Sequence, residues 1–295
     1  MTEKANDCKS LCMLIASMLI YGTVGVLRRQ IPLPSAFLSF SRGVIGGLFL
    51  LILAKVMKKD SGGKLPLNTF LLLAFTGALI GVNWMLLFEA YNHTTVAVAV
   101  LCYYMEPTIV MMLSPVIFKE RLTVKKALCA AVSIIGMVFV SGVLGDSGGE
   151  SGDILGVLLA LSAAFLYSAV VIMNKKIVGV DAYQRVTIQL FSTGIVMLPY
   201  LLLTKGFGSL EFSASAVILI FILGIVHTGI AYALYFGSMD GLRVQTIAVF
   251  SYIDPVSALL FSALLLREPL SMLNIAGAVM IIGSALISEL QTSKK

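Results

Sequence analysis

The chain has 295 residues, of which 59% are hydrophobic and only 12% are charged. Ordinary soluble domains carry about 25% charged residues, and the mean hydropathy of +0.99 places this chain far outside the soluble range. The net charge of +6 is therefore better explained by membrane topology than by nucleic-acid binding, and most of the chain is expected to lie in a lipid bilayer.

Ten apolar stretches are each long enough to cross a bilayer, which requires about 17–25 helical residues. Short breaks with turn-forming residues separate them, and the break at 144–152 is rich in Gly and Ser and lacks Lys and Arg. This linker divides five spans in residues 1–143 from five in residues 153–295. The sequence predicts an all-α integral membrane protein with ten transmembrane helices near 10–28, 34–57, 67–91, 94–118, 123–142, 153–174, 182–204, 212–238, 243–266 and 271–288.

Lysine and arginine are distributed unevenly between the two sides of these spans. With the N-terminus inside, sixteen of them fall on the inner side and four on the outer side, while Arg42 lies within a span. Cytoplasmic loops carry such an excess, so both termini are expected in the cytoplasm and the protein in the plasma membrane. No cleavable signal peptide is recognisable. The four cysteines lack CxxC or metal-ligand spacing, and no metal or cofactor is expected.

The first three spans contain four candidates for substrate contact. Tyr21 lies in the first span, and Asn83 and Trp84 lie in the third. Arg42, eight residues into the second span, is a candidate because charged side chains are rare and usually functional within a membrane. A salt bridge to Glu89, near the outer end of the third span, is slightly favoured; the alternative is that Arg42 binds a substrate carboxylate. Two GxxxG pairs indicate close helix contacts, namely Gly43 with Gly47 and Gly77 with Gly81.

An acidic residue followed by proline lies midway along the fourth and the ninth spans, as Glu106–Pro107 and Asp254–Pro255. A charge at a helix centre costs about 2.5–3.5 kcal/mol on insertion scales, so two at matched positions indicate a function. Each could exchange a proton for a cationic substrate. The structural alternative is that the carboxyl groups help to satisfy the backbone that the prolines disturb.

Helical spacing predicts which side chains lie near these acids. Tyr103 shares the face of Glu106 and is the better substrate candidate, whereas Tyr104 and Tyr252 point elsewhere and are expected to pack. Gln245, near the start of the ninth span, is a candidate donor, although a polar contact between helices explains it equally well.

The sixth, seventh and eighth spans add four candidates. His227, midway along the eighth span, could relay protons, although a buried histidine is more often structural. Tyr167 and Tyr232 belong to a set of aromatic residues near the middle of the bilayer that could surround an ammonium group, or simply fill space. Gln189 in the seventh span is a weaker candidate.

The two halves resemble each other at an offset of 148 residues. Tyr104–Pro107 aligns with Tyr252–Pro255, and residues 119–123 align with residues 267–271. Since each half has an odd number of spans, the second copy must be inverted in the membrane. Two inverted five-helix repeats are typical of transporters in which a site near the midplane opens to alternate sides.

These paired acidic–proline motifs, the turns that follow them and the AYALYF run at 231–236 resemble the EamA-type transporters of the drug/metabolite transporter superfamily. The resemblance covers essentially the whole chain, in both repeats. It implies ten helices, a central cavity between the halves and export or exchange of small metabolites. Asp254, where Glu is commoner in the family, and His227 depart from the usual pattern and leave the substrate open.

The sequence therefore favours a secondary transporter for a small amine, amino acid or related metabolite, driven by protons or by exchange. Uptake or uncoupled exchange is the alternative within transport. An intramembrane enzyme is the main rival class, but no ATP-binding loop or HExxH motif occurs. The expected partners are the solute, protons and the bilayer, with a monomer or a dimer as the functional unit.

Overall fold

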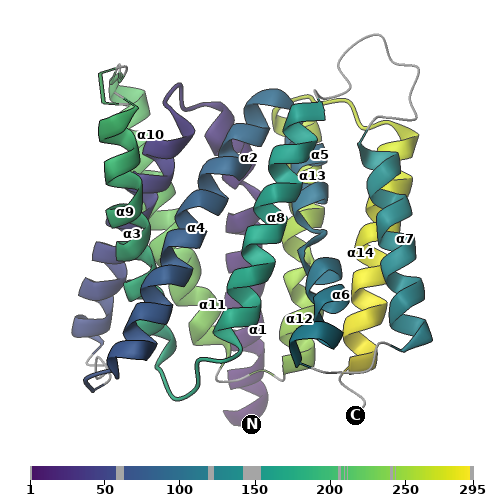
Figure 1. The fold of residues 1–295 in the computed structure, drawn as a ribbon, viewed down its shortest axis with the longest axis horizontal. Coiled ribbons are helices and arrows are strands. Elements are labelled where there is room, and N and C mark those ends of the chain that lie inside the picture. The colour runs from purple at the N-terminus through teal and green to yellow at the C-terminus, as the bar shows by residue number, and fades with distance from the viewer. Residues whose placement is uncertain are drawn as a thin grey trace.

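The computed structural model describes residues 2–57, 63–118, 123–141, 154–204, 207–208, 210, 212–239, 242 and 244–292. Within these residues the regular structure is entirely helical, and the helices run side by side across the molecule (Figure 1). The predicted linker at 144–152 and the turn at 119–122 lie outside the described residues.

Each of the ten predicted spans coincides with helical structure, although several spans comprise more than one segment. The first half contains α1 (Thr2–Gly22), α2 (Val24–Arg29), α3 (Ser35–Val56), α4 (Leu67–His93), α5 (Val96–Tyr103), α6 (Glu106–Phe118) and α7 (Val124–Val140). The second half contains α8 (Ile154–Asn174), α9 (Ala182–Leu203), α10 (Ala214–Gly224), η1 (Ile225–Ile230), α11 (Ala231–Met239), α12 (Val244–Ser251), α13 (Ile253–Leu265) and α14 (Met272–Thr292).

The helices have the length and surface of a multi-pass membrane protein. Among the described residues, seven helical stretches are long and apolar enough to cross a bilayer, and Val249–Leu265 and Met272–Ser288 are shorter apolar helices. Large apolar side chains point outward, for example Val116 (81% exposed) and Leu264 (72% exposed). Such a surface is stable in lipid, where the backbone polar groups are satisfied within each helix.

Four spans are interrupted within their length. Thr23 separates α1 from α2, Tyr104 and Met105 separate α5 from α6, and Tyr252 separates α12 from α13. In the eighth span, the α-helical hydrogen bonding gives way to the π-helix η1. Breaks of this kind are tolerated in a membrane only where protein covers them or where they line a site.

The two halves are packed together along their whole width. α7 packs on α14 at one end of the molecule, α3 and α4 pack on α9 towards the other, and α1 packs on α11 and α13 (Figure 1). α1 begins and α14 ends at the same side, whereas α1 and α8 run in opposite directions. We call the side where α1 begins the N-terminal side, and the other the distal side.

The predicted close helix contacts are confirmed at both GxxxG pairs. A Cβ atom on Gly43 would lie 2.8 Å from the carbonyl oxygen of Leu190, and one on Gly77 would overlap the backbone of Gln189. Both contacts are with α9, and they allow α3 and α4 to approach it closely.

Gly77→Ala should therefore destabilise the protein by about 1–3 kcal/mol, the usual range for overpacking, because the new methyl group meets backbone that cannot rotate away. The measurement is the thermal unfolding midpoint in detergent. Gly283→Ala is the matched control, since a methyl group there would meet no atom of the described residues within 4 Å. Equal midpoints for the two variants would contradict the close approach of α4 and α9.

Candidate functional site

The two acidic residues lie where broken helices begin again. Glu106 is the first residue of α6, and Asp254 is the second residue of α13. Pro107 and Pro255 follow them in the first helical turn, where a missing N–H costs little because that group has no partner within the helix. The prolines therefore do not disturb the hydrogen bonds of a continuous helix, as the sequence suggested, because a new helix begins there. The dipole of that helix favours a negative charge at its N-terminus.

Asp254 is bonded to the other half of the protein. The Tyr104 hydroxyl group donates a hydrogen bond to Asp254 Oδ2 at 2.7 Å, and the rings of Tyr104 and Tyr252 lie 6.4 Å apart. Helical spacing predicts only packing for Tyr104, away from Glu106, and it did not predict this hydrogen bond between the halves. Its partner lies 150 residues away on another helix, a contact that spacing along one helix does not reveal.

Tyr103 lies with Tyr167 and Asn83 between α5, α8 and α4. The Tyr103 and Tyr167 ring centroids are 5.8 Å apart, and the Tyr103 hydroxyl group lies 3.5 Å from Asn83 Oδ1. Asn83 is fully buried and donates to the carbonyl oxygen of Ala163 at 2.6 Å. Ser168, next to Tyr167 on α8, donates a hydrogen bond to the carbonyl oxygen of Glu106 at 3.2 Å, so these predicted candidates lie beside the start of α6.

Arg42 is buried in the protein interior, with 6% of its surface exposed. Its Nε donates to Thr228 Oγ1 at 2.7 Å, and its Nη2 donates to the carbonyl oxygen of His227 at 3.2 Å. The guanidinium group lies over the Trp84 ring, 4.0 Å from the ring centre. Trp84 therefore presents this face to a cation of the protein itself.

The expected salt bridge between Arg42 and Glu89 is wrong. Glu89 instead accepts a hydrogen bond from Ser35 at 2.7 Å and lies 3.4 Å from His93 Nε2. The second span turns Arg42 inward towards η1, whereas Glu89 lies at the distal end of α4, near the surface.

His227 connects two irregular segments. The His227 Nε2 atom lies 2.9 Å from Oγ1 of Thr23, which is the residue between α1 and α2. The His227 Nδ1 atom lies 3.3 Å from the carbonyl oxygen of Ile222. His227 belongs to η1, and π-helical turns occur frequently at functional sites. His227 therefore lies beside Arg42, because its carbonyl oxygen accepts a hydrogen bond from the Arg42 guanidinium group.

Tyr21 and Tyr232 complete this environment. Their ring centroids are 5.8 Å apart, edge to face, and Tyr232 stacks on Phe236 at 5.7 Å. The Tyr21 hydroxyl group is buried and has no hydrogen-bond partner among the described residues. A buried hydroxyl group of this kind is costly unless something else bonds to it.

Two predicted candidates are not placed in this cluster. Gln189 donates to Thr76 Oγ1 and to Asn174 Oδ1, both at 2.9 Å, so its amide group is used to join α9 to α4 and to the end of α8. The Gln245 side chain lies outside the described part of the structure.

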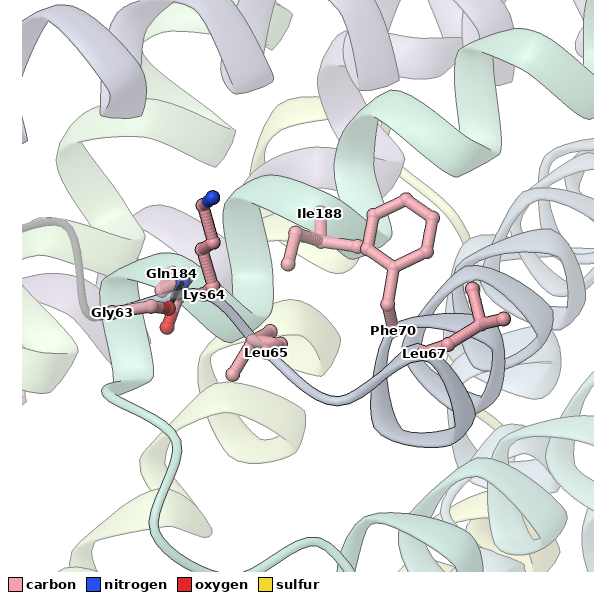
Figure 2. Close-up of a pocket in the computed structure, with 7 residues that line it drawn as sticks. All are labelled: Gly63, Lys64, Leu65, Leu67, Phe70, Gln184 and Ile188. Carbon is pink, nitrogen blue, oxygen red and sulfur yellow. Dashed lines mark hydrogen bonds between the residues drawn. The ribbon is translucent and has the colours of Figure 1, made fainter.

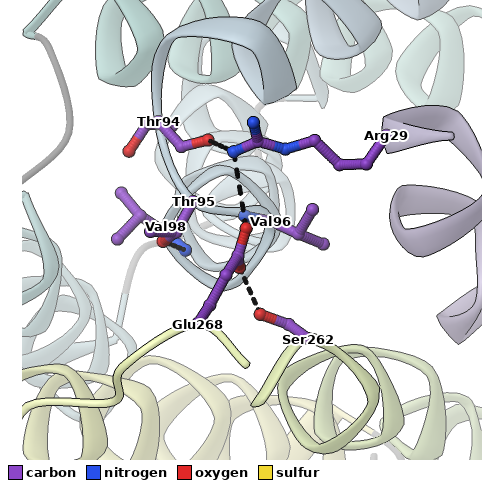
Figure 3. A network of polar contacts seen from close by, with 7 residues as sticks. All are labelled: Arg29, Thr94, Thr95, Val96, Val98, Ser262 and Glu268. Carbon is purple, nitrogen blue, oxygen red and sulfur yellow. Dashed lines mark hydrogen bonds and ion pairs between the residues drawn. The ribbon is translucent and has the colours of Figure 1, made fainter. Parts of the chain in front are cut away.

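A second polar network joins the two halves at the distal side (Figure 3). Arg29, at the end of α2, lies 3.4 Å from Glu268 Oε1 and donates to the carbonyl oxygen of Thr94 at 2.8 Å. Glu268 Oε2 accepts from the backbone N–H of Val96 at 2.8 Å and from the Ser262 hydroxyl group. A residue between α13 and α14 thereby caps α5 in the first half.

A cavity of about 530 Å³ lies away from the acids, at the N-terminal side (Figure 2). The connection between α3 and α4 forms one wall and the start of α9 forms the other. The residues that line it are Gly63, Lys64, Leu65, Leu67, Phe70, Gln184 and Ile188. None of the predicted site residues belongs to this set.

Comparison with known proteins agrees with the helical pattern. The model of the EamA-like transporter family matches residues 9–142 and again residues 154–289. The chain is 26% identical to the uncharacterized transporter YxxF of Bacillus subtilis, over 91% of this chain and 85% of that protein. It is 28% identical to an uncharacterized transporter of Archaeoglobus fulgidus, over 93% of this chain and 94% of that protein.

Two further matches are a protein whose name states an activity and a protein whose structure is solved. A probable amino-acid metabolite efflux pump of Salmonella typhimurium is 28% identical over 60% of this chain and 62% of its own length. A solved crystal structure with 20% sequence identity covers 97% of this chain and 98% of its own, with a TM-score of 0.68. The latter match shows a shared fold.

Proposed function

The chain belongs to the EamA-like transporter family, and on that basis we propose that it is a secondary active transporter for a small metabolite. The family and the names of its relatives indicate a transporter rather than an enzyme. In the proposed cycle, a proton-coupled exporter or exchanger in the plasma membrane, with both termini cytoplasmic, opens one central site to alternate sides.

We propose further that residues 1–143 and 153–295 are inverted copies. Four observations support this arrangement. The family model matches twice, α1 and α8 run in opposite directions (Figure 1), and the fourth and ninth spans are interrupted at Tyr104 and Tyr252, which the offset of 148 residues relates. Thr123 and Ser271, related by the same offset, each accept a hydrogen bond from the amide three residues later.

The observation that carries the proposed function is the position of the two acids. Glu106 and Asp254 begin half-helices within two interrupted spans, and discontinuous helices are where such transporters bind substrates and coupling ions. The hydrogen bond from Tyr104 to Asp254 joins the halves at this level. A proton on Asp254, or a solute that displaces Tyr104, would alter that contact and couple occupancy of the site to movement of the halves.

Transport should be detectable with purified protein in liposomes. We expect counterflow of at least one labelled solute from a panel of amino acids, amines and related metabolites, accompanied by a change in internal pH that a trapped dye records. Empty liposomes give the background for both signals. Counterflow without a pH change would indicate uncoupled exchange, and solute accumulation against a reversed gradient would indicate uptake. If no solute of the panel moves, the proposed function fails.

A further inference from the structure

Arg42 is a buried cation without an acidic partner in the described part of the chain. The ion pairs found there join Arg29 to Glu268 and His93 to Glu89. Neutral oxygen acceptors and a Trp84 face surround Arg42 instead. A charge at this depth is costly unless it is paired, and such a residue in a membrane protein usually marks a substrate or ion pathway.

We propose that Arg42 and Tyr21 bind the carboxylate group of the transported solute. The inference rests on the proposed transport function and deepens it, because it names the chemical class of the substrate. The binding step itself is tested independently of transport.

The contacts of Arg42 determine which edge of its guanidinium group is left to bind a solute. Nε and Nη2 form one edge of the guanidinium group, and this edge donates to Thr228 Oγ1 and to the carbonyl oxygen of His227. Both acceptors belong to η1, and the Thr228 hydroxyl group in turn donates to the carbonyl oxygen of Leu223 at 3.1 Å. Trp84 covers one face of the group. The end that carries Nη1 remains, with the second hydrogen of Nη2 beside it.

That end has the geometry of a carboxylate receptor. Nη1 has no hydrogen-bond partner among the described side chains and carbonyl groups, and two parallel N–H groups of a guanidinium match the two oxygens of a carboxylate. Lysine would offer a point charge without this fork. The two hydrogen bonds to η1 already hold the Arg42 side chain in one conformation. The conformational entropy that it loses when an anion binds is therefore smaller.

Tyr21 supplies a second donor. Its hydroxyl group is buried and has no partner in the described residues, and its ring packs edge to face on Tyr232. Thr23, two residues after Tyr21, lies 2.9 Å from His227 Nε2, and the His227 carbonyl group accepts from Arg42, so Tyr21 and Arg42 share one region of the interior. An anion bound to Arg42 would also give this hydroxyl group an acceptor.

Asp254 defines the other end of the substrate. Gly22, the residue after Tyr21, lies so close to α13 that a Cβ atom there would be 3.1 Å from the carbonyl oxygen of Asp254, and Tyr104 from the other half holds the Asp254 carboxyl group. A solute with a carboxylate at Arg42 and an ammonium group towards Asp254 would neutralise both charges. The class that fits is the amino acids and their zwitterionic relatives, in preference to simple amines.

Binding is measured by the shift in thermal unfolding midpoint of the purified protein in detergent. The probes are the twenty common L-amino acids, each compared with its decarboxylated amine and its carboxamide, together with lactate and pyruvate as carboxylates that lack an ammonium group. We expect some amino acids to stabilise the wild type, and the corresponding amines and carboxamides to have at least about tenfold weaker affinity, which corresponds to about 1.4 kcal/mol.

The variants separate a binding role from a structural one. Arg42→Gln should abolish the shift caused by the amino acid and leave the midpoint without ligand equal or higher, because it removes an unpaired buried charge. Arg42→Lys should retain weak binding. Tyr21→Phe should lower the affinity several-fold without destabilising the protein. Tyr200→Phe, the same change at an exposed position on α9, is the control and should bind as the wild type does.

Stabilisation by amines and carboxamides equal to that by amino acids would overturn the proposal. So would unchanged amino-acid binding by Arg42→Gln, or a lack of stabilisation by every carboxylate in the panel. Carboxylate binding that depends on Arg42 but is accompanied by no counterflow in liposomes would leave the carboxylate site standing and refute the proposed transport function.

Discussion

Asp254→Asn should abolish transport driven by a pH gradient. Asparagine has nearly the same shape and can still accept the hydrogen bond that Tyr104 donates at 2.7 Å, so the contact between the halves is retained. Only the ability to gain and lose a proton disappears. The expected loss is about a hundredfold or more, the lower end of what a positioned proton-transfer group contributes.

The measurement is the initial rate of solute flux in liposomes with an imposed pH gradient, compared with counterflow without a gradient. If Asp254 carries the proton, the first rate falls to background while residual counterflow persists. Glu89→Gln is the matched control, because it makes the same change from acid to amide at the distal end of α4, beside His93. Undiminished gradient-driven flux in Asp254→Asn would show that this carboxyl group does not carry the proton.

Variants of Tyr104 and Glu106 distinguish the role of the hydrogen bond from the role of each carboxyl group. Tyr104→Phe removes the hydrogen bond but retains the Asp254 carboxyl group, so we expect a several-fold change in rate with coupling preserved. Glu106→Gln tests whether the equivalent acid of the first half has the same role. The surroundings differ, since Tyr103 and Tyr167 lie near Glu106 whereas Tyr104 bonds to Asp254.

The sequence was sufficient to predict the helical spans and the close contacts of Gly43 and Gly77. Both depend on local properties: a bilayer sets the length of an apolar run, and a small residue permits a close backbone approach. The acids could also be identified from sequence, because a carboxyl group within an apolar run is unusual whatever its partners are. Their interrupted helices could not be located to the residue.

The hydrogen-bond partners of Arg42 and Tyr104 could not be predicted from the spacing of residues along one helix. Arg42 bonds to Thr228 and to the His227 carbonyl group, 186 and 185 residues away in the chain, and only tertiary packing brings these segments together. Tyr104 bonds to Asp254, 150 residues away in the chain, and spacing along one helix cannot reveal such a contact. The aromatic and acidic residues were recognisable individually, but their pairing was not.

The π-helix left only a weak signal in the sequence. His227, Thr228 and Gly229 form a short polar and small-residue interval within an otherwise apolar run. Thr23, the residue opposite His227, lies between two glycines, Gly22 and Gly25, that also contact other helices. Such intervals permit an irregular backbone, but they equally suit ordinary helix contacts, so the change in hydrogen bonding could not be predicted.

Opening of the distal side should require the Arg29–Glu268 network to separate. This network links α2 and the start of α5 in the first half to the connection between α13 and α14 in the second (Figure 3). If the halves move as alternating access requires, a covalent link between positions 29 and 268 should stop the cycle. We expect cross-linking of an Arg29→Cys/Glu268→Cys protein to reduce counterflow to the level of empty liposomes.

The experiment uses a background in which the four native cysteines are replaced, and a bis-methanethiosulfonate linker that spans the shortened side chains. Since this linker attaches through disulfides, a reductant should restore the rate of the unlinked double variant. The control is a Glu89→Cys/His93→Cys protein, cross-linked on the same side but within α4, which should transport equally with and without the linker. Full counterflow in the protein cross-linked between 29 and 268 would mean that the two halves do not part at this network during transport.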